Sequence, residues 1–136
     1  MSHWCKGACA NMQGNCSLPN TAFSKACQNT FIKDAAGQVY KIPIAHGEGR
    51  YHGSPELLNQ LQQNNQIIFT YCTEEGVVTD AANPNGSTLN IAGICNENRN
   101  VFGMMPHPER ACSAALNNTD GRAIFEQLLM AGELVK

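Results

Sequence analysis

The chain has 136 residues, of which 43% are hydrophobic and 15% are charged, a composition that suits one small globular domain with a modest core. Its formal net charge of −2 gives no excess of positive charge for binding nucleic acid or an anionic membrane surface. No apolar run approaches the ~20 residues that span a bilayer. The N-terminus also lacks an apolar signal core, so we expect a cytoplasmic protein.

Seven cysteines are many for a chain of this length, but the number is odd and most lie in unrelated contexts. This pattern argues against a secreted disulfide framework and favours reduced thiols, most of them buried. His3, Cys5, Cys9 and Cys16 could be drawn as a zinc site. Because they lack the tight Cys-x2-Cys spacing of structural zinc sites, we favour incidental thiols and expect no metal.

Taken in chain order, the first regular elements predicted are two short strands separated by a turn at Asp34–Gly37. The second of these strands is Val39–Ala45, and its alternation sets Tyr40, Ile42 and Ile44 on one side. The strand runs into His46-Gly-Glu-Gly49, a loop whose glycines allow the backbone to approach a ligand closely. Taken alone, His46 is more often a hydrogen-bonded structural histidine than a catalytic one.

A helix is predicted over Ser54–Gln63, because Ser54 is a good N-cap and Pro55 suits the first helical position. Strands are expected at Gln66–Cys72, Leu89–Cys95 and Val101–Met105, the last of them buried. Turns are expected at Asn83–Ser87 and Asn96–Asn100. The chain closes with an amphipathic helix over Asp120–Met130, and its inward residues are predicted to be Ile124, Phe125, Leu128 and Leu129.

The segment Pro106-His-Pro-Glu109 ends the third of these strands with two prolines, a histidine and a carboxylate. Pro108 biases His107 toward extended backbone, in which residues i and i+2 point the same way. His107 and Glu109 are therefore expected to meet, so that the carboxylate holds the imidazole as in a nucleophilic triad. In isolation, a structural histidine beside a solvated carboxylate is the commoner arrangement.

Three segments, taken together and in this order, favour a catalytic pair over a structural one. They are Ile42-Pro-Ile-Ala-His-Gly-Glu-Gly-Arg-Tyr51, Ala82-Asn-Pro-Asn-Gly-Ser87 and Gly103-Met-Met-Pro-His-Pro-Glu-Arg-Ala111. Together they resemble the glutamine amidotransferase subunits of phosphoribosylformylglycinamidine synthase, a purine-biosynthesis enzyme, from about residue 39 to the C-terminus. Met-Pro-His-Pro-Glu alone would indicate only a class I amidotransferase. The resemblance implies an α/β fold, namely the C-terminal portion of a doubly wound class I glutamine amidotransferase domain with an antiparallel strand extension.

The resemblance also implies a Cys-His-Glu triad, in which His107 is the general base and acid and Glu109 orients it. The cysteine attacks the glutamine amide to form a thioester, ammonia passes to a synthase subunit, and water releases glutamate. His46, Gly47, Glu48 and Gly49 would lie near the glutamine pocket or the partner interface. No cofactor is implied for this chain, since ATP and magnesium would belong to the synthase partner.

The family's nucleophile occupies a Gly-x-Cys-x-Gly elbow upstream of the His-Gly-Glu-Gly loop, and this chain begins after that point. We therefore expect residues 1–136 to be a single, partial domain that is inactive as an isolated chain. Gly93-Ile-Cys95 resembles the elbow superficially, but Glu97 replaces its second glycine and His107 follows only twelve residues later. The alternative is a non-catalytic interaction module, or a half-domain that docks on a synthase partner or on a complementary chain.

Overall fold

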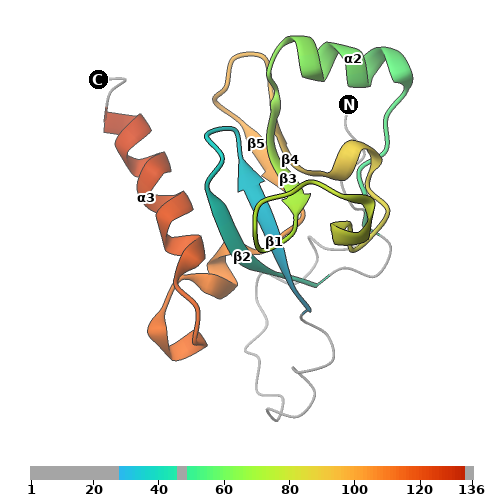
Figure 1. The fold of residues 1–136 in the computed structure, drawn as a ribbon. Helices are drawn as coiled ribbons and strands as arrows, with labels where there is room; N and C mark the ends of the chain where they lie inside the picture. Colours follow the sequence, from blue (N-terminus) through green and yellow to red (C-terminus); the bar gives the residue numbers. More distant parts are fainter. Residues whose placement is uncertain (1–27, 46–48, 134–136) are drawn as a thin grey trace.

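The computed structural model describes residues 28–45 and 49–133, which form a mixed α/β fold around one five-stranded sheet (Figure 1). The strands follow the order β2-β1-β3-β4-β5, and all four neighbouring pairs are antiparallel. The strands are β1 (Gln28–Asp34), β2 (Val39–Ile44), β3 (Ile67–Cys72), β4 (Ile91–Cys95) and β5 (Phe102–Met104), and the α-helices are α2 (Pro55–Gln63) and α3 (Asp120–Glu133). Both the α/β class and the expected antiparallel strands are confirmed.

The predicted turn at Asp34–Gly37 joins β1 to β2. One carboxylate oxygen of Asp34 accepts hydrogen bonds from the backbone N–H groups of Ala36 and Gln38, both at 2.9 Å. Gly37 has a φ of +94°, which an L side chain rarely adopts. The turn therefore follows from local chemistry. Among the described strands, β2 pairs with β1 alone and lies at one edge of the sheet.

The predicted helix is α2, and Ser54 is its N-cap as expected. The Ser54 hydroxyl accepts a hydrogen bond from the N–H of Leu57 at 3.3 Å, and Pro55 occupies the first turn. Leu61 is buried, but Leu57 is 39% exposed, so the leucines of this helix are only partly covered.

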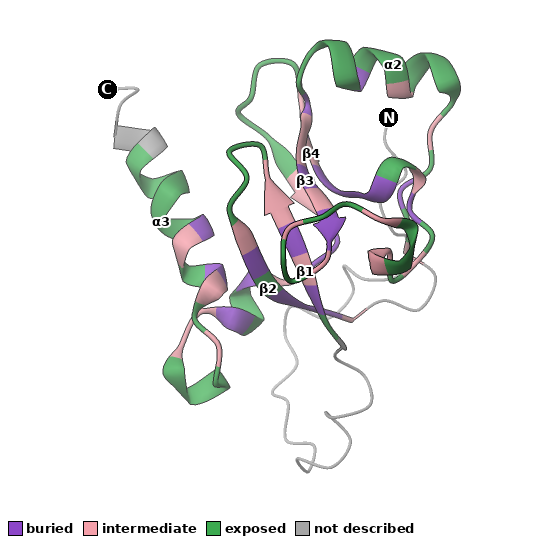
Figure 2. Ribbon diagram, viewed as in Figure 1, coloured by how far each residue is buried: buried purple, intermediate pink, exposed green. Residues whose placement is uncertain are grey.

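The core divides into two clusters, each with one helix packed against it. Figure 2 marks the buried residues of the strands and of both helices in purple. The larger cluster contains Ile32, Tyr40, Ile42, Ile44, Phe69, Tyr71, Ala92, Ala111 and Ile124. The smaller contains Tyr51, Leu61 and Ile91, with Leu58 partly buried against them. Ile91 and Ala92 are adjacent on β4 but belong to different clusters, because successive strand residues point to opposite faces. The helices α2 and α3 accordingly lie on different sides of the sheet (Figure 1).

The predicted inward face of α3 is wrong beyond Ile124. Ile124 is buried, whereas Phe125, Leu128 and Leu129 are 38%, 42% and 71% exposed. Among the described side chains of the helix, the apolar ones that pack in the larger cluster are Ile124 and the partly buried Ala123, both near its start. The apolar stripe of α3 therefore extends further than the surface that covers it.

Two strand predictions also need correction. The strand β5 is the short outer strand of the sheet, so Val101 is 63% exposed and Phe102 37% exposed rather than buried. The expected strand at Leu89–Cys95 begins only at Ile91, because Leu89 and Asn90 both have a φ of +54° within a 3₁₀ turn. Neither helix of the described part of the chain is long and apolar enough to cross a membrane.

Candidate active site

A backbone hydrogen bond fixes His107 to the edge strand β2, which is distant from it in sequence. After β5, the N–H of Met105 donates to the carbonyl oxygen of Ala92 at 3.0 Å, which extends the pairing with β4 by one bond. The chain then turns at Pro106, and the N–H of His107 donates to the carbonyl oxygen of Pro43 at 2.8 Å. His107 therefore lies where the segment after β5 meets the outer edge of β2.

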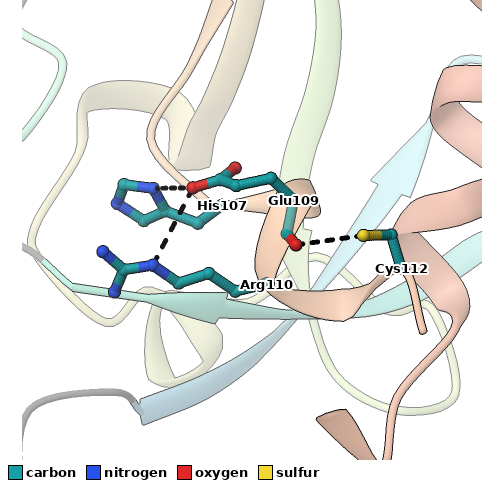
Figure 3. Close-up of polar contacts among 4 residues, drawn as sticks. All are labelled: His107, Glu109, Arg110 and Cys112. Carbon is teal, nitrogen blue, oxygen red and sulfur yellow. Dashed lines mark hydrogen bonds and ion pairs between the residues drawn. The ribbon is translucent and has the colours of Figure 1, made fainter. Parts of the chain in front are cut away.

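Glu109 holds the imidazole of His107, as the sequence predicts. Nδ1 of His107 lies 2.8 Å from Oε1 of Glu109, and the two side chains are 27% and 57% exposed (Figure 3). A carboxylate accepts hydrogen bonds, so Nδ1 carries the proton and Nε2 keeps a lone pair when the imidazole is neutral. This is the arrangement that a general base needs.

The backbone that brings the two side chains together differs from the prediction. Extended chain was expected to set residues i and i+2 on one side, but Pro108–Ala111 forms a 3₁₀ helix. His107 is its N-cap, with φ −107° and ψ 87°, and Pro108 takes the first helical position. A tight helical turn after His107, rather than a strand, therefore returns the carboxylate to the imidazole.

Arg110 is a third polar group at this site, and the sequence reasoning missed it. Its Nε lies 3.8 Å from the same Glu109 oxygen that contacts His107 (Figure 3). Both side chains are largely exposed, so this ion pair contributes only about 0–1 kcal/mol. The signal in the sequence was a guanidinium directly after the carboxylate.

None of the three described cysteines hydrogen-bonds to His107. Cys72 and Cys95 are buried, and burial raises the pKa of the Cys72 thiol, which disfavours its nucleophilic thiolate form at neutral pH. Cys112 is less buried, but its Sγ donates to the backbone carbonyl oxygen of Glu109 at 3.0 Å, on the side away from the imidazole (Figure 3). The imidazole of His107 and the carboxylate of Glu109 are thus together, while none of these three thiols is bonded to that imidazole.

The metal prediction and most of the predicted ligand loop fall outside the described residues. These are the possible zinc ligands His3, Cys5, Cys9 and Cys16, and the loop residues His46, Gly47 and Glu48. Residues 28–45 and 49–133 contain no group of three or more histidine, cysteine, aspartate or glutamate side chains that could hold a metal ion.

Gly49, the last residue of the predicted ligand loop, is described and is tied to the turn at Asn83–Ser87. Its carbonyl oxygen accepts a hydrogen bond from Nδ2 of Asn85 at 2.8 Å. Asn85 is held in turn by the N–H of Ser87, which donates to its Oδ1 at 3.1 Å. The sequence predicted the turn from its composition but gave no sign that it anchors the end of this loop.

Asn83 organises the same turn from within. Its Oδ1 accepts hydrogen bonds from the backbone N–H groups of Asn85, Gly86 and Ser87, and its Nδ2 donates to the Ser87 carbonyl and to Asn90. Asparagine suits this role because its side chain readily bonds to nearby backbone groups. The second of the three sequence motifs is therefore a structural anchor.

Comparison with protein families matches residues 15–129 to the CobB/CobQ-like glutamine amidotransferase domain. Two similar curated proteins from different organisms share one name. The chain is 58% identical over 103 residues to "Phosphoribosylformylglycinamidine synthase subunit PurQ" of Chlorobium chlorochromatii, covering 75% of this chain and 44% of that protein. It is 53% identical over 93 residues to the subunit of that name from Methanocaldococcus jannaschii, covering 68% of this chain and 40% of the relative.

A solved structure agrees with these sequence relatives. The fold matches a chain in the structure of PurLQS from Thermotoga maritima with a TM-score of 0.60 and 32% identity, over 77% of this chain and 47% of that one. The chain thus spans less than half the length of the relatives described here. On the extent of the family match and the identity to these subunits, the chain belongs to the CobB/CobQ-like glutamine amidotransferase family.

Proposed function

We propose that this chain supplies the base and its orienting carboxylate for glutamine hydrolysis in phosphoribosylformylglycinamidine synthase, within de novo purine biosynthesis. The observation that carries the proposal is the 2.8 Å contact between Nδ1 of His107 and Oε1 of Glu109. It leaves Nε2 as the proton acceptor for a nucleophile, as amidotransferase chemistry requires. A cytoplasmic location, glutamine as substrate and a synthase subunit as partner belong to the same proposal, as does the inactivity of the isolated chain.

In this mechanism His107 acts twice on protons. It takes the proton of a cysteine thiol supplied from outside the described residues, and the sulfur attacks the side-chain amide carbon of glutamine. When the carbon–nitrogen bond breaks, the imidazolium returns that proton to the departing nitrogen, so ammonia and a glutamyl thioester form. Water then adds to the thioester with His107 again as base, and glutamate leaves with the thiol restored. Glu109 stabilises the imidazolium and keeps the ring oriented throughout.

A chimera tests the proposal. Residues 39–136 replace the corresponding part of the Chlorobium chlorochromatii subunit, and glutamate release is measured with that organism's synthase subunit present. We expect the chimera to hydrolyse glutamine, and we expect His107→Ala to lower kcat by about 10²–10⁴-fold, the usual contribution of a general base. His52→Ala, which removes an exposed histidine, is the control and should retain activity. A His107→Ala chimera that is as active as its parent would refute the proposed role.

A second candidate function is docking on a complementary polypeptide, and one surface favours it. A hollow of about 340 Å³ lies between α3 and the sheet. Its apolar lining includes Ile68, Phe69, Phe102, Ile124 and Leu128. Of these residues, Phe102 and Leu128 are more than a third exposed, and α3 also exposes Phe125 and Leu129. Because the chain matches less than half of each relative described, the occupant we propose is the remaining part of an amidotransferase domain.

Docking predicts measurable binding in solution. The unmatched part of the Chlorobium chlorochromatii subunit is purified separately and titrated with the full 136-residue chain in a calorimeter. Leu128→Asp should weaken the complex by at least tenfold, since it sets a charge in an apolar contact. Leu116→Asp, at a residue that is 51% exposed and outside the hollow, should leave the affinity unchanged. Absence of binding, or equal weakening by both variants, would exclude this function.

A further inference from the structure

The outer edge of β2 holds both the His107 segment and the start of α3. The N–H of Lys41 donates to Oδ2 of Asp120 at 2.8 Å, and the carbonyl oxygen of Lys41 accepts from Nδ2 of Asn118 at 2.7 Å. Two residues further along, the carbonyl oxygen of Pro43 accepts from the N–H of His107. In a strand, the backbone groups of residues i and i+2 face the same edge, so these bonds form one row. Figure 1 shows α3 beginning beside this strand.

Gly121 brings α3 into direct backbone contact with the site. It is buried, and a Cβ added to it would lie 2.2 Å from the carbonyl oxygen of Pro108 and 2.9 Å from its Cα. Both separations are shorter than real Cβ contacts, and the atoms it meets are backbone atoms that cannot rotate away. The first turn of α3 can therefore reach this position only because residue 121 has no side chain.

The residue that Gly121 presses against lies between the two members of the pair. Pro108 follows His107 and precedes Glu109, and it is buried at the start of the 3₁₀ helix that returns the carboxylate to the imidazole. To relieve the clash between an added Cβ and Pro108, one of the two backbone segments would have to move by about 1 Å. A displacement of that size is enough to disrupt a catalytic geometry. A shift of Pro108 would carry the backbones of both His107 and Glu109 with it.

We propose that Gly121 is a positioning residue for the His107–Glu109 pair and acts through the backbone of Pro108. The row of bonds to β2 fixes His107 and the start of α3 on one edge, and the close approach at Gly121 sets the distance between them. The inference rests on the proposed function, because it assumes that the pair is a base and its orienting carboxylate. It assigns part of the site's precision to a helix that supplies neither member of the pair.

The test observes the imidazole of His107 directly in the full 136-residue chain. Long-range proton–nitrogen spectra recorded near pH 8.5, well above the usual histidine pKa of ~6.5, distinguish a protonated Nδ1 from a protonated Nε2. Glu109→Gln supplies the reference spectrum for a pair that is not held by a carboxylate. We expect Gly121→Ala to move the His107 ring signals toward that reference spectrum. Arg122→Ala, in the same turn of α3 but exposed, should leave them unchanged.

A second variant covers the case in which Gly121→Ala does not fold. Asp120→Ala removes the acceptor for the Lys41 N–H and adds no atom near Pro108. We expect it to loosen α3 and to speed hydrogen exchange of the His107 amide by at least tenfold, without a comparable change at amides in β3. Unchanged ring signals in a folded Gly121→Ala protein, or unchanged exchange at His107 in Asp120→Ala, would overturn the proposal. Because neither readout is an activity, failure of the glutaminase function would be seen separately, in the chimera.

Discussion

Replacing Glu109 by glutamine is expected to lower the kcat of the chimera for glutamine by about 10²–10⁴-fold, with a much smaller change in KM. The amide keeps the size of the side chain but removes the negative charge that stabilises the imidazolium. It can also turn its N–H toward Nδ1, which would leave the proton on Nε2 and block proton acceptance there. The measurement is steady-state glutamate release at several glutamine concentrations.

The structure supplies a matched control for Glu109→Gln. Glu126 is exposed to a similar degree and pairs with a basic neighbour, Arg122 Nε, at 2.8 Å, but it lies on α3 outside the site. Glu126→Gln removes the same charge and should keep kcat within about twofold, because exposed ion pairs are worth only about 0–1 kcal/mol. Equal losses in the two variants would mean that net charge, and not the contact with His107, accounts for the effect.

Ile42→Ala is expected to destabilise the chain by about 2–5 kcal/mol in urea unfolding, because it leaves a cavity in the larger core cluster. Ile42 is fully buried on β2 and belongs to the same cluster as Tyr71 and Ile124. Total stabilities of native domains are only ~5–15 kcal/mol, so this one change could consume much of the stability of this chain. Loss of β2 would also remove the edge that holds His107.

Two further variants separate cavity formation from a general loss of apolar surface. Ile42→Val removes one methylene from the same position and should cost about 0.5–1.5 kcal/mol. Val101→Ala removes apolar atoms from a side chain that is 63% exposed and should change stability by less than about 0.5 kcal/mol. If Val101→Ala destabilised the chain as much as Ile42→Ala, the described core would not be what holds the fold together.

Local chemistry made part of the fold predictable. The turn between β1 and β2 follows from the carboxylate of Asp34 and the positive φ of Gly37, and the start of α2 follows from Ser54 and Pro55. These signals act between residues that are close in sequence, so the sequence carries them without knowledge of the fold. Alternation likewise identified the buried face of β2 at Tyr40, Ile42 and Ile44.

The features that the sequence did not predict depend on distant partners. Periodicity marked one face of α3 as apolar but could not show how much of the sheet that face would meet, so Leu128 and Leu129 were wrongly assigned to the core. The close approach of Gly121 to Pro108 requires the two segments to be docked together. The meeting of His107 and Glu109 was predicted correctly, although from extended backbone rather than the 3₁₀ turn that produces it.

The central claim, that Glu109 acts through His107, is tested most directly by a double-mutant cycle in the chimera. The kcat of the parent is compared with those of His107→Ala, Glu109→Gln and the variant that carries both changes. If the carboxylate serves only to hold and stabilise the imidazole, the second change should have almost no effect once His107 is gone. We therefore predict that the double variant is as slow as His107→Ala alone. Losses that multiply, so that Glu109→Gln lowers kcat equally with and without His107, would contradict the account.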